Sequence, residues 1–197
     1  MSDYRIIHPQ IGAVPVSVTG TTKLLPLGYV AQAQDLQTGS TNCGCGEFRY
    51  VVGPAASGPS KGDLAMLKGN TVQQAGSASS GSYLPLGIAA GAISATNVYG
   101  WVQVRGLCDY AKMENATTDT YLAGGRAATA FIGSTTDGCM NTTQTATGNA
   151  IIGIGFPMGP ITLTGASRVW STASFSNMTV QLFYPQIRGQ SDSAGGM

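Results

Sequence analysis

Leu84-Pro-Leu-Gly-Ile-Ala-Ala-Gly-Ala-Ile-Ser-Ala-Thr-Asn-Val-Tyr-Gly-Trp-Val-Gln-Val-Arg-Gly-Leu-Cys-Asp-Tyr110 is the stretch that decides the fold. Residues 101–105 (Trp-Val-Gln-Val-Arg) are rich in the β-branched and aromatic side chains that suit a half-buried strand. Gly100 and Gly106 bracket this run and predict its two ends. Residues 88–93 are small and apolar, and they predict a second strand that lies close under a bulky neighbour such as Trp101. The stretch therefore predicts a hairpin against which the rest of the chain packs.

The rest of the chain repeats this character in shorter pieces. Residues 47–52 alternate, with Phe48 and Tyr50 on one face and Glu47 and Arg49 on the other, as in a strand with one buried side. No segment keeps a period of 3.6 over ten or more residues, although a short helix within 63–74 is an alternative. Many short strands between Gly and Pro turns predict an all-β fold, a single Gly-rich β-barrel or β-sandwich that is jelly-roll-like or β-tulip-like. Further strands are expected within residues 63–68, 129–132, 150–156, 161–164, 168–173 and 178–184.

Composition divides the chain into three parts. Residues 1–22, interrupted by Pro9 and Pro15, predict an extended N-terminal arm. This segment is either the first strand of the domain's own sheet or an arm that reaches a neighbouring subunit, and both readings stay open. Residues 23–188 predict the β-barrel or β-sandwich domain, with a long Thr/Gly/Asn loop over 133–149. Residues 189–197 are Ser- and Gly-rich and predict a flexible tail.

The chain is unusually poor in charge. Charged residues make up 10% of its 197 residues, against about 25% in typical soluble domains. The formal net charge is +1, which gives little electrostatic support for nucleic-acid binding. No apolar run reaches the roughly 18 residues of a membrane-spanning helix, and the start lacks a secretory signal pattern, so we expect synthesis in a cytosol. A weakly charged surface is tolerable where partners cover it.

The residues that could carry chemistry each have a simpler reading. The single histidine, His8, precedes Pro9 in the expected arm, a poor place for a rigidly held catalytic base. Cys43 and Cys45 are spaced too closely for a zinc knuckle, and the other two cysteines, Cys108 and Cys139, are isolated. The carboxylates are scattered singly. We therefore expect no catalytic, cofactor-binding or metal-binding residues.

Two further patterns resemble binding motifs. The loop Gly53-Pro-Ala-Ala-Ser-Gly-Pro-Ser-Lys61 superficially resembles a phosphate-binding loop, but Pro59 stands where that motif needs its lysine. Four aromatic residues could form a sugar-binding platform, although core packing is the simpler use for them: Tyr99, Trp101, Trp170 and Phe175.

Four pieces in succession carry a resemblance to a known family. They are Leu25-Pro-Leu-Gly-Tyr-Val30, Gly44-Cys-Gly-Glu-Phe-Arg-Tyr-Val-Val52, Leu86-Gly-Ile-Ala-Ala90 and Tyr99-Gly-Trp-Val-Gln-Val-Arg-Gly106. In this order the chain resembles the head decoration (capsid cement) proteins of marine and freshwater tailed phages. The resemblance covers roughly residues 24–132, with a weaker echo in 150–182. The extra Pro/Ser loops, Cys43-x-Cys45 and the longer C-terminal part depart from the family pattern.

The resemblance implies a virion protein without catalytic activity or cofactor. It would be made in the host bacterial cytoplasm, bind the outside of the major capsid protein shell and join neighbouring subunits, as a homotrimer or a dimer, with no nucleic-acid or membrane partner. We place its interface in the N-terminal segment, at Tyr4, Ile6, Ile7, Ile11, Val14, Val16 and Val18.

Two other readings remain. A tail, fibre or host-binding lectin-like protein would share this composition. A carbohydrate-active enzyme on a jelly roll would need two carboxylates about 5–9 Å apart in a groove.

Overall fold

The computed structural model describes residues 3–8, 12–37, 44–55, 58–75, 85–112, 131–132, 138–141, 151–157, 163–164, 167–168 and 178–187. None of these residues is helical. The strands are β1 (Tyr4–His8), β2 (Gly12–Pro15), β3 (Val30–Asp35), β4 (Cys45–Val52), β5 (Leu64–Lys68), β6 (Thr71–Gln74), β7 (Leu86–Ala89), β8 (Tyr99–Ala111), β9 (Phe131–Ile132), β10 (Met140–Asn141), β11 (Ile151–Pro157), β12 (Leu163–Thr164), β13 (Ser167–Arg168) and β14 (Met178–Ile187).

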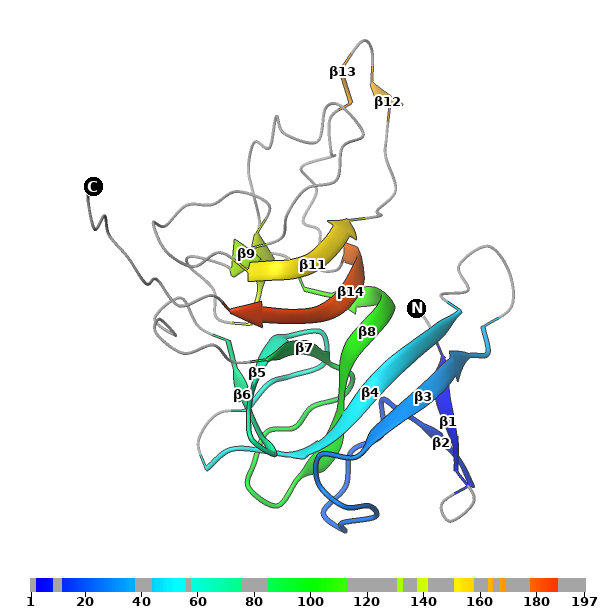
Figure 1. The fold of residues 1–197 in the computed structure, drawn as a ribbon, viewed down its shortest axis with the longest axis vertical. Helices are drawn as coiled ribbons and strands as arrows, with labels where there is room; N and C mark the ends of the chain where they lie inside the picture. The colour runs from blue at the N-terminus through cyan, green and yellow to red at the C-terminus, as the bar shows by residue number, and fades with distance from the viewer. Residues whose placement is uncertain are drawn as a thin grey trace, which may run out of the picture.

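Ten of these strands form one mixed sheet in the order β11-β14-β8-β7-β5-β6-β4-β3-β1-β2 (Figure 1). Strand β8 also pairs with β4, so the pairings β4–β8–β7–β5–β6–β4 close a cycle. The pairing of β4 with β6, at Val52 and Thr71, is parallel; the other pairings within the described strands are antiparallel. The predicted all-β fold is confirmed. Its finer class, barrel or sandwich, stays a prediction.

Some of the sequence expectations are met and others are wrong. Strands β4, β11 and β14 lie where alternation and apolar runs predicted them. The helix considered within 63–74 is instead the β5–β6 hairpin, because Gly69 and Asn70 form a two-residue turn and Gly69 takes a φ of 63°. Within the expected loop over 133–149, Met140 and Asn141 pair with β9. The expected tail at 189–197 lies outside the described residues.

The β7–β8 hairpin is confirmed, with Ile88 opposite Gln103 and Ala89 opposite Val102. The expected strand ends are wrong, because Gly100 and Gly106 both lie inside the 13-residue strand β8. A Cβ atom on Gly100 would lie 2.8 Å from Ile93 Cγ1, and one on Gly106 would lie 2.6 Å from the Cys45 carbonyl oxygen. Gly106 also has a φ of 99°. Gly100, the second residue of β8, and Gly106, in its second half, therefore permit close packing against neighbouring segments and do not end the strand.

Strand β5 shows why an almost continuous apolar run is a strand here. Leu64 and Met66 contribute to one buried cluster, while Ala65 and Leu67 contribute to a second cluster on the opposite face. Strand β8 does the same with Trp101 and Val102. Because both faces of these strands are covered, the side chains that point to either face are apolar.

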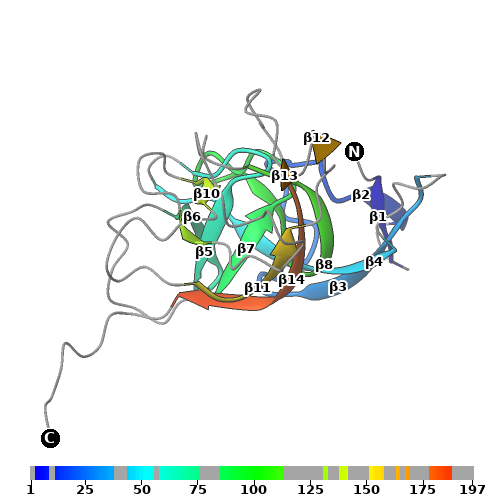
Figure 2. The ribbon, with the colours of Figure 1, turned by 90° about the horizontal axis from the view of Figure 1, so that it is seen from above.

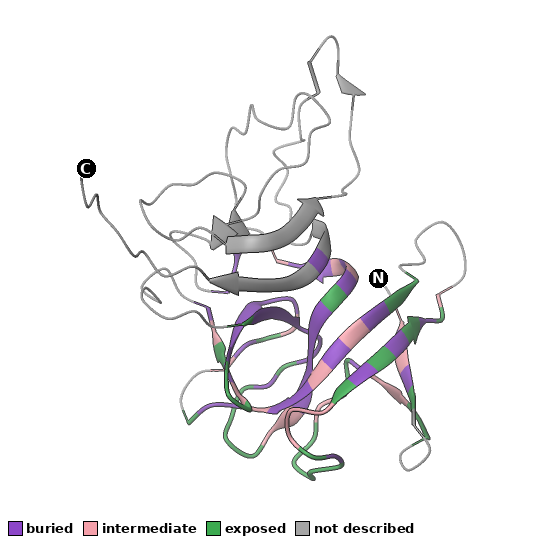
Figure 3. Ribbon diagram, viewed as in Figure 1, coloured by how far each residue is buried: buried purple, intermediate pink, exposed green. Residues whose placement is uncertain are grey.

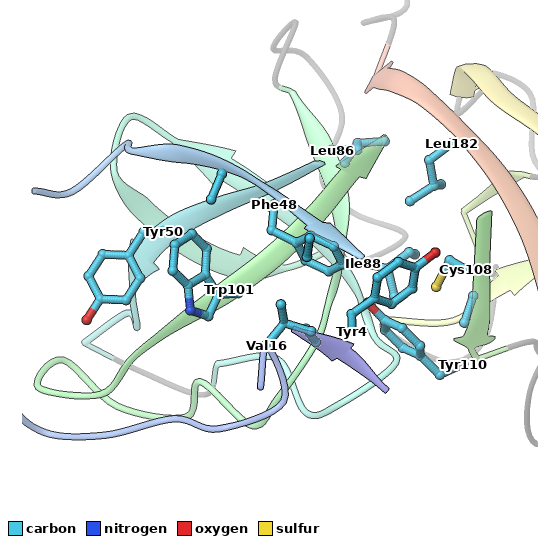
Figure 4. Packing of buried hydrophobic residues seen from close by; sticks show 14 of the residues in the cluster. Tyr4, Val16, Phe48, Tyr50, Leu86, Ile88, Trp101, Cys108, Tyr110 and Leu182 are labelled. Carbon is cyan, nitrogen blue, oxygen red and sulfur yellow. The ribbon is translucent and has the colours of Figure 1, made fainter. Parts of the chain in front are cut away.

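The larger cluster is built around aromatic side chains from several strands (Figure 4). The rings of Tyr4 and Phe48 have centroids 5.1 Å apart, and those of Tyr50 and Trp101 are 4.9 Å apart, both tilted. Such tilted pairs add to the stabilisation from buried area. Strands β1, β4 and β8 are thus joined through their side chains.

A buried polar network lies inside this cluster, where β8 changes register against β4. Gln103 is fully buried; its Nε2 donates to the carbonyl oxygens of Leu107 and Arg105 at 3.0 and 3.3 Å, and its Oε1 accepts from the Tyr110 hydroxyl at 2.8 Å. The Tyr4 hydroxyl donates to the same Leu107 carbonyl at 2.6 Å. The network supplies partners for buried backbone carbonyls near the irregularity.

The N-terminal segment is part of this core. Strand β1 pairs with β2 and, through Tyr4 and Arg5, with β3. Tyr4 and Ile6 are 2% and 1% exposed. Ile7, the next residue along β1, is 74% exposed. Over its described residues the segment expected as an extended arm is therefore a hairpin in the domain's own sheet, the first of the two readings. Figures 1 and 2 both place it at the opposite end from the β5–β6 hairpin.

We expect Gly106→Ala to lower the free energy of unfolding by about 3 kcal/mol, because left-handed strain of roughly 1–2 kcal/mol adds to an overpacking penalty of about 1–3 kcal/mol. Gly69→Ala is the matched control: φ is also positive, but nothing lies within 4 Å of the added Cβ, so a loss of about 1 kcal/mol is expected. Urea unfolding measures both. Equal losses would show that close packing at Gly106 is not the constraint.

The neighbouring isoleucines of β1 test whether the hairpin belongs to the core. We expect Ile6→Ala to lower the free energy of unfolding by about 2–4 kcal/mol and Ile7→Ala to change it by less than about 0.5 kcal/mol. Chemical denaturation of the two variants decides. An Ile6→Ala protein as stable as the wild type would mean that β1 is detached in solution.

Burial raises the pKa of Tyr110 well above 10.0, with nearby Cys108 contributing in the same direction. Well below pH 10 this tyrosine is protonated in both the folded and unfolded states, and its effect on stability is constant. Above that pH the unfolded chain loses the proton first, so we expect stability to fall by up to about 1.4 kcal/mol per pH unit from this group. Tyr110→Phe is expected to flatten the decline between pH 10 and 11.5. An unchanged slope would contradict the assignment.

Candidate docking surface

One side of β1, β2, β3 and the first half of β4 faces solvent, and we call it the outer face. From Val51 onward this side of β4 is covered by the second buried cluster. The registers place its residues in cross-strand rows: Pro15–Arg5–Gln34–Cys45, Ala13–Ile7, Gln32–Glu47–Arg105 and Val30–Arg49. Figure 3 shows the alternation of exposed and buried residues along β3 that produces this face. Because side chains alternate strictly along a strand, the opposite residues of β1, β3 and β4 lie in the core.

Strand β3 has the simplest pattern. Ala31, Ala33 and Asp35 are buried, while Val30, Gln32 and Gln34 are exposed. Asp35 closes the strand: its Oδ1 accepts the backbone N–H groups of Asp3 and Gln37 at 2.8 and 3.0 Å. This carboxylate ties the start of β1 to the end of β3, and so fixes the two strands that carry most of the outer face.

The apolar part of the outer face is formed by two large exposed side chains. Ile7 is 74% exposed and Val30 is 50% exposed, with the smaller Ala13 and Pro15 beside Ile7 and Arg5. An exposed apolar side chain alone is ordinary. Here, however, the side chains stand on paired strands whose other faces pack in the core, so the surface is preorganised for binding.

The charges of the outer face are nearly all balanced within it. Arg5 pairs with Asp3 at 3.1 Å, and Arg105 pairs with Glu47 at 3.1 Å. Both pairs are partly exposed, so each contributes little to stability. Gln32 and Gln34 supply neutral donors and acceptors between them. The face is therefore polar and weakly charged, with an apolar end.

The structure separates the seven residues expected at an interface. Tyr4, Ile6 and Val16 are buried in the chain's own core, so we leave them out of the candidate surface. Val14 is half-buried, and Val18 is 56% exposed in the connection after β2. Ile11 lies outside the described residues. Ile7 is thus the residue of this set that lies on the outer face.

The other residues that could act as catalytic or metal-binding groups have positions in the folded strands and loops. Asp63 is buried and accepts hydrogen bonds from the Ser60 N–H at 2.8 Å and Gln74 Nε2 at 2.9 Å, with Lys112 Nζ at 2.6 Å. This network joins the 58–63 loop to β6 and the end of β8. His8 ends β1, opposite Gly12. Among the described residues, no cluster of three or more His, Cys, Asp or Glu side chains could hold a metal ion.

The loop from Gly53 packs against the connection between β7 and β8. The Gly53 N–H donates to the Val98 carbonyl at 2.9 Å, and the Ile93 N–H donates to the Pro59 carbonyl at 2.8 Å. A Cβ atom on Gly58 would lie 2.0 Å from the Ile93 carbonyl oxygen. The glycines of this loop therefore serve close packing.

The proposed sugar platform is not assembled by the described residues. Trp101 is 2% exposed in the core, while half-buried Tyr99 stacks on Tyr50 at 6.1 Å. Trp170 and Phe175 lie outside the described residues. Among the cysteines, Cys45 is an exposed thiol at the edge of the outer face, Cys108 and Cys139 are buried thiols, and Cys43 lies outside the description.

Comparison with known proteins adds no relative: no protein-family model, curated protein or solved structure matches the chain. Within the part of the chain that the structure describes, no helix has the length and apolarity needed to cross a membrane.

Proposed function

We propose that this chain is a structural virion protein that binds the outer surface of a tailed-phage capsid and joins neighbouring major capsid protein subunits. The observation that supports this most is the outer face: a solvent-exposed area on four paired strands, weakly charged, with Ile7 and Val30 exposed. Low charge reduces the desolvation penalty of docking such a surface against another protein. The ordered resemblance to decoration proteins supports the choice of partner.

The proposed protein works by adhesion rather than by transforming a molecule. A stable contact buries on the order of 1,200–2,000 Å² in total. A homotrimer would present three outer faces, and a dimer two. Once one face is bound, the others are held near the shell at a high effective concentration. Each contact can then be weak while the assembly stays on the shell. The proposed localisation is the capsid surface, after synthesis in the bacterial cytoplasm.

Undecorated heads assembled from the major capsid protein of the same genome provide the direct test. The purified protein is mixed with these heads, and free protein is separated from the heads by sedimentation. We expect the protein to sediment with the heads and its binding to saturate as its concentration is raised. Absence from the heads, or binding to tails instead, would contradict the proposal; tail binding would favour the fibre or host-binding reading.

Substitution of Ile7 on the outer face tests whether this face makes the contact. Deletion of residues 1–22 is unsuitable, because it would also remove Tyr4, Ile6 and Val16 from the core. We expect Ile7→Asp to weaken binding to heads at least tenfold, since a buried isoleucine contributes about 1.5–3 kcal/mol and 1.4 kcal/mol is a factor of ten. Leu24→Asp is the matched control. Leu24 is 53% exposed in the connection between β2 and β3, and its N–H donates to the hydroxyl of Tyr50, which lies on the core side of β4. Binding of this variant is expected to be unchanged. Equal effects of the two variants would remove the outer face as the contact.

A further inference from the structure

Arg49 on strand β4 differs from the other arginines of the outer face. Arg5 and Arg105 each have a carboxylate partner at 3.1 Å. Within the described residues Arg49 has none: its Nη2 donates to the Gly69 carbonyl oxygen at 3.1 Å and lies 3.5 Å from Asn70 Oδ1. Its Nε is buried and has no hydrogen-bond partner among the described residues. Among the described residues the positive charge of this guanidinium is therefore uncompensated.

The position of Arg49 is fixed by the turn that it contacts. Gly69 and Asn70 form the β5–β6 turn, and the Asn70 carbonyl accepts the Val52 N–H at 3.0 Å, so the turn is bonded to β4 at two points. Gly28 closes the other side: a Cβ atom there would lie 2.7 Å from Asn70 Oδ1 and 3.7 Å from Arg49 Nη2. A guanidinium held in this way loses less conformational entropy on binding a ligand than a free side chain does.

The surroundings define what could bind. Arg49 lies directly across from exposed Val30, so its charge adjoins the apolar part of the outer face. The ion pairs leave no excess negative charge on the face: Arg5, Arg49 and Arg105 stand against Asp3 and Glu47. A complementary surface would bring a carboxylate to Arg49 and an apolar side chain to Val30.

We infer that Arg49 binds an Asp or Glu carboxylate of the capsid protein, with Val30 in apolar contact beside it. This inference rests on the proposed function, because it names a group on the partner that the outer face would contact. The guanidinium donates N–H groups to carboxylate oxygens, a pairing that arginine makes more specifically than lysine because its donors are planar and fixed. Arg49 thus selects the partner and the orientation of docking.

Binding of the chain to undecorated heads, measured against salt, tests the inference with four proteins. We expect Arg49→Glu to weaken binding about tenfold or more, in the range of a charge pair at a partly desolvated interface, and to reduce the salt dependence. Arg49→Lys is expected to keep part of the affinity. Lys68→Glu makes the same change in net charge at an exposed residue outside the cross-strand rows of the outer face. It is expected to weaken binding less than about threefold.

The outcomes separate this inference from the proposed function. Wild-type protein that fails to bind heads would overturn both. Wild-type binding with an Arg49→Glu protein that binds equally well, or with Lys68→Glu as damaging as Arg49→Glu, would overturn the Arg49 contact and leave the proposed function standing. Thermal unfolding of each variant is measured in parallel. If Arg49→Glu lowers both stability and binding, an unchanged salt dependence would assign Arg49 to the turn alone and overturn the contact.

Discussion

Strand β8 is the element on which the rest of the structure depends, because it is hydrogen-bonded to β4, β7 and β14. Its 13 residues pair with β4 along one edge and with β7 and then β14 along the other edge. Gly106 lies next to the register shift against β4, and its φ of 99° and its contact with the Cys45 backbone leave no room for a side chain. Gln103 then supplies hydrogen bonds to carbonyls on both sides of Gly106.

Tyr4 connects the N-terminal hairpin to β8 and β4. The Tyr4 hydroxyl is bonded to Leu107 on β8, and its ring packs on Phe48 of β4, so the N-terminal hairpin is held by the same network that stabilises β8. Asp35 holds the same end of β1 against β3, because its carboxylate accepts the Asp3 N–H. The strands that display Ile7, Val30 and Arg49 therefore have fixed positions, and a binding surface on them requires little ordering when a partner arrives.

Sequence patterns predicted the parts of this arrangement that depend on local alternation. Phe48 and Tyr50 inside with Glu47 and Arg49 outside followed from period two, and the apolar composition around Trp101 predicted a central strand. Gly100 and Gly106 misled, because a glycine that ends a strand and one that admits a neighbouring backbone look alike in a sequence. The buried role of Tyr4 and Ile6 depends on contacts with strands more than 30 residues away.

The outer face was harder to recognise for a related reason. Ala31 and Ala33 are buried beside exposed Val30, Gln32 and Gln34, and alanine gives little sign of which side it faces. The charge difference between Arg49 and the other two arginines arises from pairing across strands, as between Glu47 and Arg105. Alternation placed Arg49 outside, but the absence of a carboxylate partner among the described residues is a property of the folded chain.

Imaging of decorated heads at side-chain resolution by electron cryo-microscopy tests the central claim most directly. We expect the chain on the outside of the shell, with the outer face of β1, β3 and β4 against the major capsid protein and Arg49 within hydrogen-bond distance of a capsid carboxylate. Heads that carry the chain with this face turned to solvent, or heads that carry none of it, would contradict the account.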